Sequence, residues 1–519
     1  KERRTEGKEM ARGKSTVAIA ASTDAALEDL RAPLDARLSY EQVDVVVRRA
    51  LELDQSEQAL KKIVQPTDWV AIKPNIVTSP SHDCSYWYNG VAHPGQVTDL
   101  RVIKSLIGYL IDSCRPRRIS IAEGGAEWQK ATEPDQEDGW TVSFPEFDGL
   151  SYVGIVEEFE AICPGLVDIV DLNCDEIRFL PVPDPFASGV GPMQRVGQEM
   201  RPPEQFGRSA YVPDTGELRE GYHIPATVLD CDKLISVPAM KTHTCATTLA
   251  LKNYVGILPT HPSGVVRKHN IHQGDFQKGF LDLFSYHPAD YSLIEGFWST
   301  EGNGPQWGDN IRHNVVVASA DPVAADAVCS EVMGFNAQDI DYLHLAAQKR
   351  FGTLDPEEIE VVGNSVEVVM RKFKLAAGRK GVAFAARGNR SWMVRNGTEE
   401  WLRLDSEERY IDLARFFGEY AAETACAAVE VRSGKMQCGS LWASAAGKMR
   451  VLLNGQTVVE KEQGSGHEFA EFKVDVELAE GINRLEVQVE PCEEGMGFTA
   501  LLCDADGYGL RDIEYRLDS

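Results

Sequence analysis

A regular alternation of short apolar runs and amphipathic segments restricts the fold of this chain more than any other feature. Three runs rich in β-branched residues predict buried strands: residues 16–20, 69–72 and 118–122. The segments between them carry apolar side chains at helical spacing: residues 41–51, behind a start at Ser39 or Glu41, and residues 96–114. Strand and helix in alternation at these lengths predict an α/β fold, with a mostly parallel sheet and helices on both faces.

The same domain is expected to extend over residues 15–375. Further apolar runs predict additional strands: residues 167–170, 177–180, 291–294, 314–318 and 359–362. Two Pro-, Gly- and acid-rich stretches, 126–150 and 183–222, are interpreted as insertions over the sheet. The charged residues 1–14 are interpreted as a disordered leader or as residues foreign to the native chain, and 376–384 as a linker.

The composition changes after this linker, and residues 385–519 predict a second domain of a different class. Five alternating segments predict short strands: residues 427–431, 448–453, 471–476, 483–489 and 497–503. Asn454-Gly455 between two of them is a strong signal for a β-hairpin. Strands at this spacing predict an antiparallel, jelly-roll-like β-sandwich.

The overall composition limits the partners of the chain. The formal net charge of −27 over 519 residues would repel a phosphate backbone over most of the surface, so we expect no nucleic-acid partner. No apolar run is long enough to span a bilayer. The 11 cysteines include no CxxC pair, which argues against zinc-ribbon and iron–sulfur sites of that spacing. Most cysteines are expected to be reduced, with Cys426–Cys438 or Cys492–Cys503 as alternative disulfides in the β-rich end.

The stretch 232–272 concentrates side chains that can do chemistry. It begins as an apolar strand and then carries amines, an amide, imidazoles and a thiol: Lys241, His243, Cys245, Lys252, Asn253, His261, His269 and His272. Ligand sites of α/β proteins lie beyond the carboxyl ends of their strands, so we expect the site here. Lys252 follows the apolar run 249–251, where desolvation would lower the pKa of its amine and make it a usable base or nucleophile. The alternative is a surface lysine that snorkels past its apolar neighbours.

Polar residues at the ends of other predicted strands are expected to complete the site. Lys73 and Asn75 follow one strand and offer donors for an anionic or hydroxylated ligand. Glu123 follows another strand and is interpreted as an acid or base, or alternatively as a cap of the next segment. The expected catalytic groups are Lys252, His243 and Glu123. The expected substrate ligands are Lys73, Asn75, Lys241, Asn253, Glu295, Glu301 and Asn303, the last three around a Gly-rich turn.

A transition-metal site is the alternative use of the central stretch. Imidazole and thiolate suit zinc, iron or nickel, and the expected ligands are His243, Cys245, His269 and His272. The spacing of these residues is not specific, because histidines in proteins are more often hydrogen-bonded residues than metal ligands. Metal binding therefore stays open beside a metal-free site.

Four blocks of the first domain resemble, in order, those of the domain of unknown function 362 family. They are VAIKPNI, KLISVPAMKTHTCATTLALKNYVGILP, EGFWSTEGNGP and ASADPVAADAVCSEVMGFN. The resemblance covers residues 15–363 and implies an α/β domain with its polar blocks gathered at one edge of the sheet. It implies no particular activity, because the family is largely without an assigned one.

The order of a strand, a Lys/His-containing turn, a helix ending in lysine and a later histidine is also similar to the nickel-pincer lactate racemase family. This similarity implies that Lys252 holds a pyridinium-derived pincer cofactor, and that His243 and His269 act near nickel. The chain departs from the racemase pattern at 123–125, which reads Glu-Gly-Gly instead of Gly-His-Arg, and at 250–251, which lacks the paired glycines. A pincer cofactor is therefore one hypothesis, and an unknown cofactor is another.

The final segment resembles galactose-binding-like β-sandwich modules through MRVLLNGQTVVEKE, ELAEGINRLEVQVE and GFTALLCDADGYGL. This resemblance implies a glycan ligand and an extracytoplasmic (periplasmic or secreted) protein, with a cytoplasmic location as the alternative. Three tryptophans are candidates for stacking on a sugar and equally for the core: Trp392, Trp401 and Trp442.

These patterns lead to two functional hypotheses of different class. The first is an enzyme, isomerase- or racemase-like or an oxidoreductase, that acts on a small sugar-like or hydroxy-acid substrate. It would work by proton or hydride transfer, with or without a metal. The second is a non-catalytic extracytoplasmic protein that binds a glycan or assembles with its own copies into a homo-oligomer.

Overall fold

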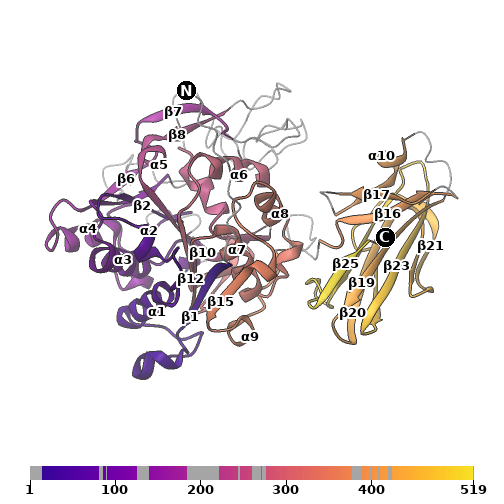
Figure 1. Cartoon of the computed structure of the whole chain (residues 1–519), viewed down its shortest axis with the longest axis horizontal. Coiled ribbons are helices and arrows are strands. Elements are labelled where there is room, and N and C mark those ends of the chain that lie inside the picture. The colour runs from indigo at the N-terminus through magenta and orange to yellow at the C-terminus, as the bar shows by residue number, and fades with distance from the viewer. Residues whose placement is uncertain are drawn as a thin grey trace. The chain divides into compact units, whose positions relative to one another are not determined.

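The computed structural model describes residues 14–80, 86–88, 90–124, 139–183, 221–243, 246–259, 271, 276–376, 387–397, 400–406, 409–418 and 424–517. The chain forms two compact units (Figure 1). We call the first, Lys1–Met333 with Tyr342–Ala376, the α/β unit, and the second, Gly334–Asp341 with Ala377–Ser519, the sandwich unit. Over the described residues, no helix is long and apolar enough to cross a membrane.

A mixed sheet forms the centre of the α/β unit, with strand order β15-β1-β14-β12-β9-β2-β5-β6. The bounds of these strands are β1 (Ser15–Ala21), β2 (Trp69–Pro74), β5 (Arg118–Glu123), β6 (Val167–Asp171), β9 (Lys233–Val237), β12 (Tyr291–Asn303), β14 (Val315–Ser319) and β15 (Ile359–Gly363). β14 is antiparallel to both of its neighbours, and every other pair along this order is parallel. The predicted α/β class with a mostly parallel sheet is confirmed.

Helices cover both faces of this sheet (Figure 1). They are α1 (Tyr40–Leu53), α2 (Leu60–Ile63), α3 (Leu100–Tyr109), α4 (Tyr152–Glu160), α5 (Ala226–Asp230), α6 (Phe276–Tyr286), α7 (Pro322–Val332), α8 (Asp341–Gln348) and α9 (Val366–Val369). Ala18 and Ala20 of β1 join the apolar core under α1, α3 and α4. α7 contacts the same strand but contributes nothing to that core, because it packs on the opposite face.

The starts of the first long helices show where local sequence signals succeed and fail. α1 begins behind Ser39 as predicted, since Ser39 and Gln42 form a reciprocal capping box. α3 begins only after Asp99, whose carboxylate accepts a hydrogen bond from the backbone of Arg101, so the helix predicted over 96–114 is too long. Shorter 3-10 or π turns are η1 (Ala25–Leu30), η2 (Pro94–Gln96), η3 (Leu110–Cys114), η4 (Pro145–Phe147), η7 (Lys252–Ile257), η9 (Ala337–Asp339) and η10 (Pro356–Glu358).

Strand β12 is much longer than the run 291–294 that predicted it. It continues to Asn303 and turns back as β13 (Trp307–Ile311), so Glu295 lies inside a strand and not at its end. β10 (Ala239–His243) pairs parallel with β12, with an irregular register between Ala239 and Lys241, and β11 (Ala246–Thr248) pairs antiparallel with β10. Two further antiparallel strand pairs belong to the unit: β3 (Trp87–Tyr88) with β4 (Val91–Ala92), and β7 (Ile177–Pro181) with β8 (Gly221–Pro225).

The sandwich unit is built from antiparallel strands around a separate apolar core, as predicted. Its elements are β16 (Ser391–Asn396), β17 (Leu402–Asp405), β18 (Ile411–Asp412), α10 (Leu413–Phe417), β19 (Ala425–Ser433), β20 (Gln437–Leu453), β21 (Gln456–Ser465), β22 (Phe472–Leu478), β23 (Gly481–Glu490), β24 (Gly497–Cys503) and β25 (Ile513–Arg516). β20 pairs with β22 and β24 through its first part and with β21 and β23 through its last part, which links the two layers. Asn454 and Gly455 have φ of 51° and 78°, the left-handed geometry of the predicted hairpin turn.

The cysteines of the sandwich unit are free thiols, which corrects the expectation of a disulfide there. Cys492 Sγ donates to the carbonyl oxygen of Ser465, and Cys503 Sγ donates to that of Ser440. Their sulfurs are therefore engaged at different strands. Cys426 and Cys438 are free as well.

Candidate functional site

A buried ion pair joins the ends of two parallel strands. Lys73 of β2 and Glu123 of β5 are each 1% exposed, and Lys73 Nζ lies 2.5 Å from Glu123 Oε2. Lys73 Nζ also donates to Asn253 Oδ1 (3.3 Å), while Asn253 Nδ2 donates to the carbonyl oxygen of Lys73 (3.1 Å). Burial lowers the pKa of Lys73, and the charge of Glu123 opposes this decrease. The structure thus brings three predicted site residues together.

The turn η7 reaches this ion pair through a glycine. Gly256 accepts a hydrogen bond from the backbone of Gly124 at 2.9 Å, and a Cβ at position 256 would collide with Glu123 Oε1 and Lys73 Nζ. Lys252 and Asn253 were expected on a regular helix, but they begin this short 3-10 turn instead. The close approach of Gly256 explains why the turn can carry Asn253 into contact with the strand ends.

Lys241 of β10 and Glu295 of β12 form a second buried group of opposite charges. Both side chains are fully buried, and Ala239 of β10 lies opposite Glu295 in the sheet. Lys241 Nζ donates to the carbonyl oxygen of Ala239 (3.2 Å), so its ammonium turns toward that register position. Glu295 accepts hydrogen bonds from the backbone N–H groups of Asp99 (3.2 Å) and Phe297 (2.9 Å), which hold its carboxylate in place.

Burial moves the pKa values of this pair toward neutrality. It lowers the pKa of Lys241 to about 7; Glu295 opposes the decrease, whereas the ammonium groups of Lys252 and Lys73 add to it. It raises the pKa of Glu295 to about 8, and the charge of Asp99 adds to this increase. An ammonium with a lowered pKa releases its proton more readily, and a carboxylate with a raised pKa accepts one more readily. The pair can therefore donate and accept protons near neutral pH.

Two threonine hydroxyls flank Lys241 across the sheet. Lys241 lies opposite Thr248 of β11 and opposite Thr300 of β12, and paired residues of neighbouring strands share a face. Both threonines are buried, and in the described part of the chain neither hydroxyl has a hydrogen-bond partner. A Cβ at Gly95 would lie 2.6 Å from Thr300 Oγ1, so the backbone of η2 packs closely against this side chain. We call Thr248, Lys241 and Thr300 the central row.

Lys252 and His243 both contact one aromatic ring. Lys252 Nζ lies 5.4 Å from the ring centroid of Phe276 in α6, and the imidazole of His243 lies 5.9 Å from the same centroid. Lys252 is only 7% exposed, so its amine is withdrawn from bulk water. Its charge acts on Lys241, which places the two amines in one electrostatic environment.

A carboxylate that the sequence did not single out holds the turn carrying Lys252. Asp326 of α7 accepts hydrogen bonds from the backbone N–H groups of Ala250 (2.7 Å) and Leu251 (3.2 Å), and from the hydroxyl of Tyr342 (3.3 Å). Burial raises the pKa of Asp326 to about 7. A lone acid within the small apolar residues of 322–329 was the signal that could have identified it.

The remaining predicted substrate ligands differ in their surroundings. The backbone N–H of Asn75 donates to Thr98 Oγ1 (2.8 Å), and the buried Oδ1 of Asn75 has no partner among the described residues. Glu301 pairs with Lys374, whose Nζ lies 3.2 Å away, so its carboxylate is engaged at the β12–β13 hairpin. Asn303 is the last residue of β12 and lies at the same hairpin.

Three of the four predicted metal ligands lie outside the described residues: Cys245, His269 and His272. His243 is the fourth. Within the part of the chain that the structure describes, no group of three or more His, Cys, Asp or Glu side chains could hold a metal ion. The predicted metal site stays a prediction.

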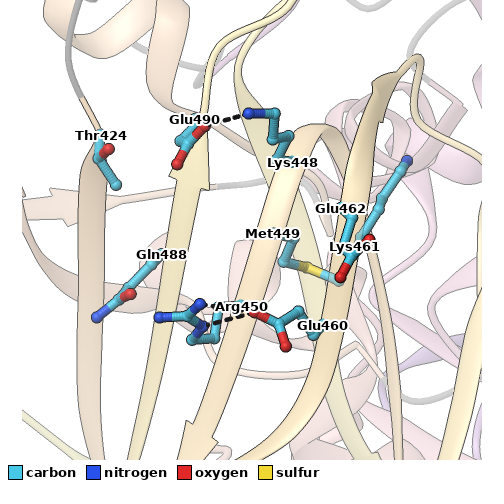
Figure 2. A pocket seen from close by; sticks show the side chains of 9 residues that line it. All are labelled: Thr424, Lys448, Met449, Arg450, Glu460, Lys461, Glu462, Gln488 and Glu490. Atoms are coloured by element: carbon cyan, nitrogen blue, oxygen red, sulfur yellow. Dashed lines mark hydrogen bonds and ion pairs between the residues drawn. The ribbon is translucent and has the colours of Figure 1, made fainter.

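The sandwich unit has a polar groove of about 240 Å³ (Figure 2). It is lined by Thr424, Lys448, Met449, Arg450, Glu460, Lys461, Glu462, Gln488 and Glu490. Four of its charged groups form ion pairs within the groove, since Lys448 Nζ lies 2.9 Å from Glu490 Oε2 and Arg450 lies 2.6 Å from Glu460. None of these described lining residues is aromatic.

The three tryptophans considered for sugar stacking are covered by other side chains. Trp392 belongs to the sandwich core and is 1% exposed. Trp442 is buried beneath Lys473, whose Nζ lies 3.6 Å from its ring centroid. Trp401 is half-buried under the guanidinium of Arg395, at 4.6 Å. Trp392 and Trp442 are therefore buried residues, whereas Trp401 keeps part of its surface exposed.

Fold and site together define a mixed α/β protein with two buried lysine–glutamate groups, one at the ends of β2 and β5 and one within β10 and β12, followed by an antiparallel sandwich. The family model described as domain of unknown function (DUF362) matches residues 197–331 of the chain. This match includes the central row, Glu295 and Asp326, whereas Lys73 and Glu123 lie outside it. The wider extent of the resemblance, over residues 15–363, and the likeness to nickel-pincer racemases stay predictions.

A thylakoid-associated protein, sll1697, from Synechocystis sp. (strain ATCC 27184 / PCC 6803 / Kazusa) is 26% identical to the chain over 176 residues. The alignment covers 33% of this chain and 54% of that protein. The chain therefore spans about half the length of this curated relative.

Solved structures resemble only small parts of the chain. A β-glucosidase from Kluyveromyces marxianus has 15% identity and a TM-score of 0.19, over 22% of this chain and 16% of that one. A family 35 carbohydrate-binding module from Clostridium thermocellum has 12% identity and a TM-score of 0.13, over 21% of this chain and 88% of that one. At these TM-scores the likeness supports no statement about function.

Proposed function

We propose that the α/β unit is an enzyme that transfers a proton on a small hydroxylated substrate, a hydroxy acid or a sugar-like molecule. Lys241 and Glu295 are the proton-transferring pair in this proposal, one donating a proton while the other accepts one. The observation that carries the proposal is the burial of these two groups on neighbouring strands, beside two threonine hydroxyls that have no partner in the described chain. Buried hydroxyls normally have hydrogen-bond partners, so two unpaired hydroxyls beside these charged groups favour a ligand site over a purely structural role.

The pKa values of the pair place both groups within reach of neutral pH, so each can give up or take a proton there. Near neutral pH, an ammonium with a pKa of about 7 and a carboxylate with a pKa of about 8 can each change protonation state at little cost. Ordinary lysine and glutamate side chains cannot, because their pKa values lie several units away from neutrality. This matching of pKa to working pH is how enzymes obtain an acid and a base from common residues.

The other expected site residues take supporting parts. Lys73 is committed to Glu123 and Asn253, so we assign these three to holding the strand ends and η7 in position. Asn75 offers a buried carbonyl oxygen that can accept a hydrogen bond from a substrate hydroxyl. Lys252 and His243 remain candidates for a second proton transfer beside Phe276. Metal assistance and glycan binding by the sandwich unit stay alternatives.

Exchange of carbon-bound hydrogen tests the proposal. Full-length protein is incubated in D2O with a panel of small hydroxy acids and sugar acids, and loss of C–H signals is followed by ¹H NMR. We expect the wild type to exchange at least one substrate, and Lys241→Met and Glu295→Gln to slow exchange by about 10²-fold or more. Thr242→Val is the matched control, because Thr242 neighbours Lys241 but faces the other side, where its hydroxyl donates to the carbonyl oxygen of Gly302 (2.7 Å). Undiminished exchange in both folded active-site variants would contradict the proposal, as would no exchange of any substrate by the wild type.

A further inference from the structure

The central row presents hydrogen-bonding groups on three adjacent strands. Thr248, Lys241 and Thr300 lie opposite one another on β11, β10 and β12. Neighbouring strands are about 4.8 Å apart, so the two threonines lie about 10 Å apart with the lysine between them. The next residues along the strands, Thr242 and Thr247, face the other side and have protein partners, Gly302 and Tyr342. The two threonines beside Lys241 thus differ from their strand neighbours Thr242 and Thr247, whose hydroxyls are bonded.

A bound ligand would supply the hydrogen bonds that these unpaired groups lack. A buried hydroxyl without a hydrogen bond is costly, and native structures retain few of them without a functional reason. Here two such hydroxyls flank one ammonium, and among the described residues Lys241 Nζ makes one hydrogen bond, 3.2 Å to the carbonyl oxygen of Ala239. The amines of Lys73 and Lys252 act on Lys241 as like charges, so a negative charge at the row would relieve their repulsion.

The spacing of the row limits the length of the ligand. Two hydrogen bonds of about 2.8 Å cannot close a gap of about 10 Å unless the ligand oxygens are at least about 4 Å apart. The two oxygens of a single carboxylate, and those of a two-carbon hydroxy acid, are closer than this. A chain of about four to six carbons with an oxygen near each end can reach both threonines.

We propose that the central row binds a linear sugar acid, a polyhydroxylated monocarboxylate whose oxygens reach Thr248 and Thr300 while Lys241 holds its negative charge. This inference deepens the proposed function and rests on it, because the bound acid is the molecule on which Lys241 and Glu295 act. It selects the sugar-acid class over short hydroxy acids and over neutral sugars.

Binding to full-length protein by isothermal titration calorimetry at constant ionic strength tests the inference. The probes are sodium gluconate, sodium erythronate, sodium glycolate as the short acid, and erythritol as the neutral chain. We expect gluconate or erythronate to bind with a Kd at least about tenfold below that of glycolate and of erythritol, because only they satisfy both threonines and the charge. Equal affinity for all four probes, or no binding of either long acid, would overturn the inference.

Variants of the row separate a binding role from a structural one. Thr248→Val and Thr300→Val should each raise the Kd of the long acid about tenfold. They should leave the Tm of the unliganded protein unchanged or higher, since the lost hydroxyl had no partner in the described chain. Thr242→Val is the control and should show the opposite pattern, a lower Tm with unchanged affinity, because its hydroxyl is bonded to Gly302. A lower Tm with unchanged Kd in the two row variants would show that the hydroxyls serve the fold.

The outcomes also distinguish this inference from the proposed function. Tight binding of a long acid without C–H exchange would contradict the proposed proton transfer but not the proposed binding by the central row. C–H exchange on glycolate or erythritol that Thr248→Val and Thr300→Val do not slow would contradict binding by the central row but not the proposed proton transfer.

Discussion

Glu295 shows how burial turns an ordinary carboxylate into a group that titrates near neutrality. It has no exposed surface, and its neighbour Asp99 carries the same charge. Its two backbone hydrogen bonds, from Asp99 and Phe297, only partly offset these effects. The pKa therefore rises to about 8, whereas in the unfolded chain it returns to the ordinary value of 4.5.

This shift predicts a pH dependence of stability with a definite sign. Between about pH 4.5 and pH 8 the native state holds a proton on Glu295 that the unfolded state has lost, so its contribution to stability falls as pH rises through that window. Glu295→Gln removes this contribution. We expect the unfolding free energy of the variant to gain on the wild type steadily from pH 5 to pH 8, as measured by urea denaturation at several pH values. A constant difference across the window would contradict the assigned pKa.

The pKa of Lys241 shifts in the opposite direction, and its effect on stability dominates at higher pH. Its pKa is lowered to about 7 in the native state, so from about pH 7 to pH 10.5 the unfolded state binds more protons. Its contribution to stability therefore rises with pH over that window. Glu295→Gln leaves Lys241 with one fewer opposing charge, which should lower the Lys241 pKa further.

At the scale of single elements, the turn η7 depends on a helix that lies far from it in sequence. Asp326 of α7 accepts the N–H groups of Ala250 and Leu251 immediately before η7. Asp326→Ala leaves both buried donors without an acceptor, at about 1–3 kcal/mol each. We expect a matching fall in the free energy of unfolding by urea, and slower C–H exchange because Lys252 and Asn253 lose their position. Asp326→Asn keeps one acceptor oxygen and should show a smaller loss; equal stability of all three proteins would remove the role assigned to Asp326.

The elements also show which parts of the site the sequence could reveal. Apolar runs located β1, β2, β5 and β9, and the polar residues after them pointed to Lys73 and Glu123. The end of an apolar run at Ile294 wrongly ended β12 before Glu295, because the strand continues through polar residues that are buried in the sheet. The central row depends on the register of three strands, one of them only three residues long, and no local pattern encodes such a register.

At the scale of the whole molecule, the chain contains two separate apolar cores. One lies under α1, α3 and α4, and the other lies inside the sandwich unit. The change of composition after residue 376 made two classes of domain predictable. The inclusion of Gly334–Asp341 in the sandwich unit was not, because it depends on tertiary contacts of a short segment.

Because the two cores are separate, we expect a destabilising substitution in one unit to leave the activity of the other unit unchanged. Leu502→Ala removes a side chain that is 1% exposed in the sandwich core and should cost about 2–5 kcal/mol. We expect calorimetry to show a lower transition temperature for the sandwich unit, with C–H exchange at the α/β unit unchanged below that temperature. Leu106→Ala in the other core is the counterpart and should lower the α/β transition instead. Loss of exchange in Leu502→Ala at a temperature where both units are folded would contradict this separation.

The pKa of Lys241 is the quantity that tests the proposed proton transfer most directly. Protein labelled with ¹³C at lysine Cε is titrated by NMR from pH 5 to pH 11, and the Lys241 signal is assigned by its absence in Lys241→Met. We expect one lysine signal with a midpoint near 7 that moves down further in Glu295→Gln. A Lys241 signal that titrates above pH 9, together with the other lysines, would contradict it.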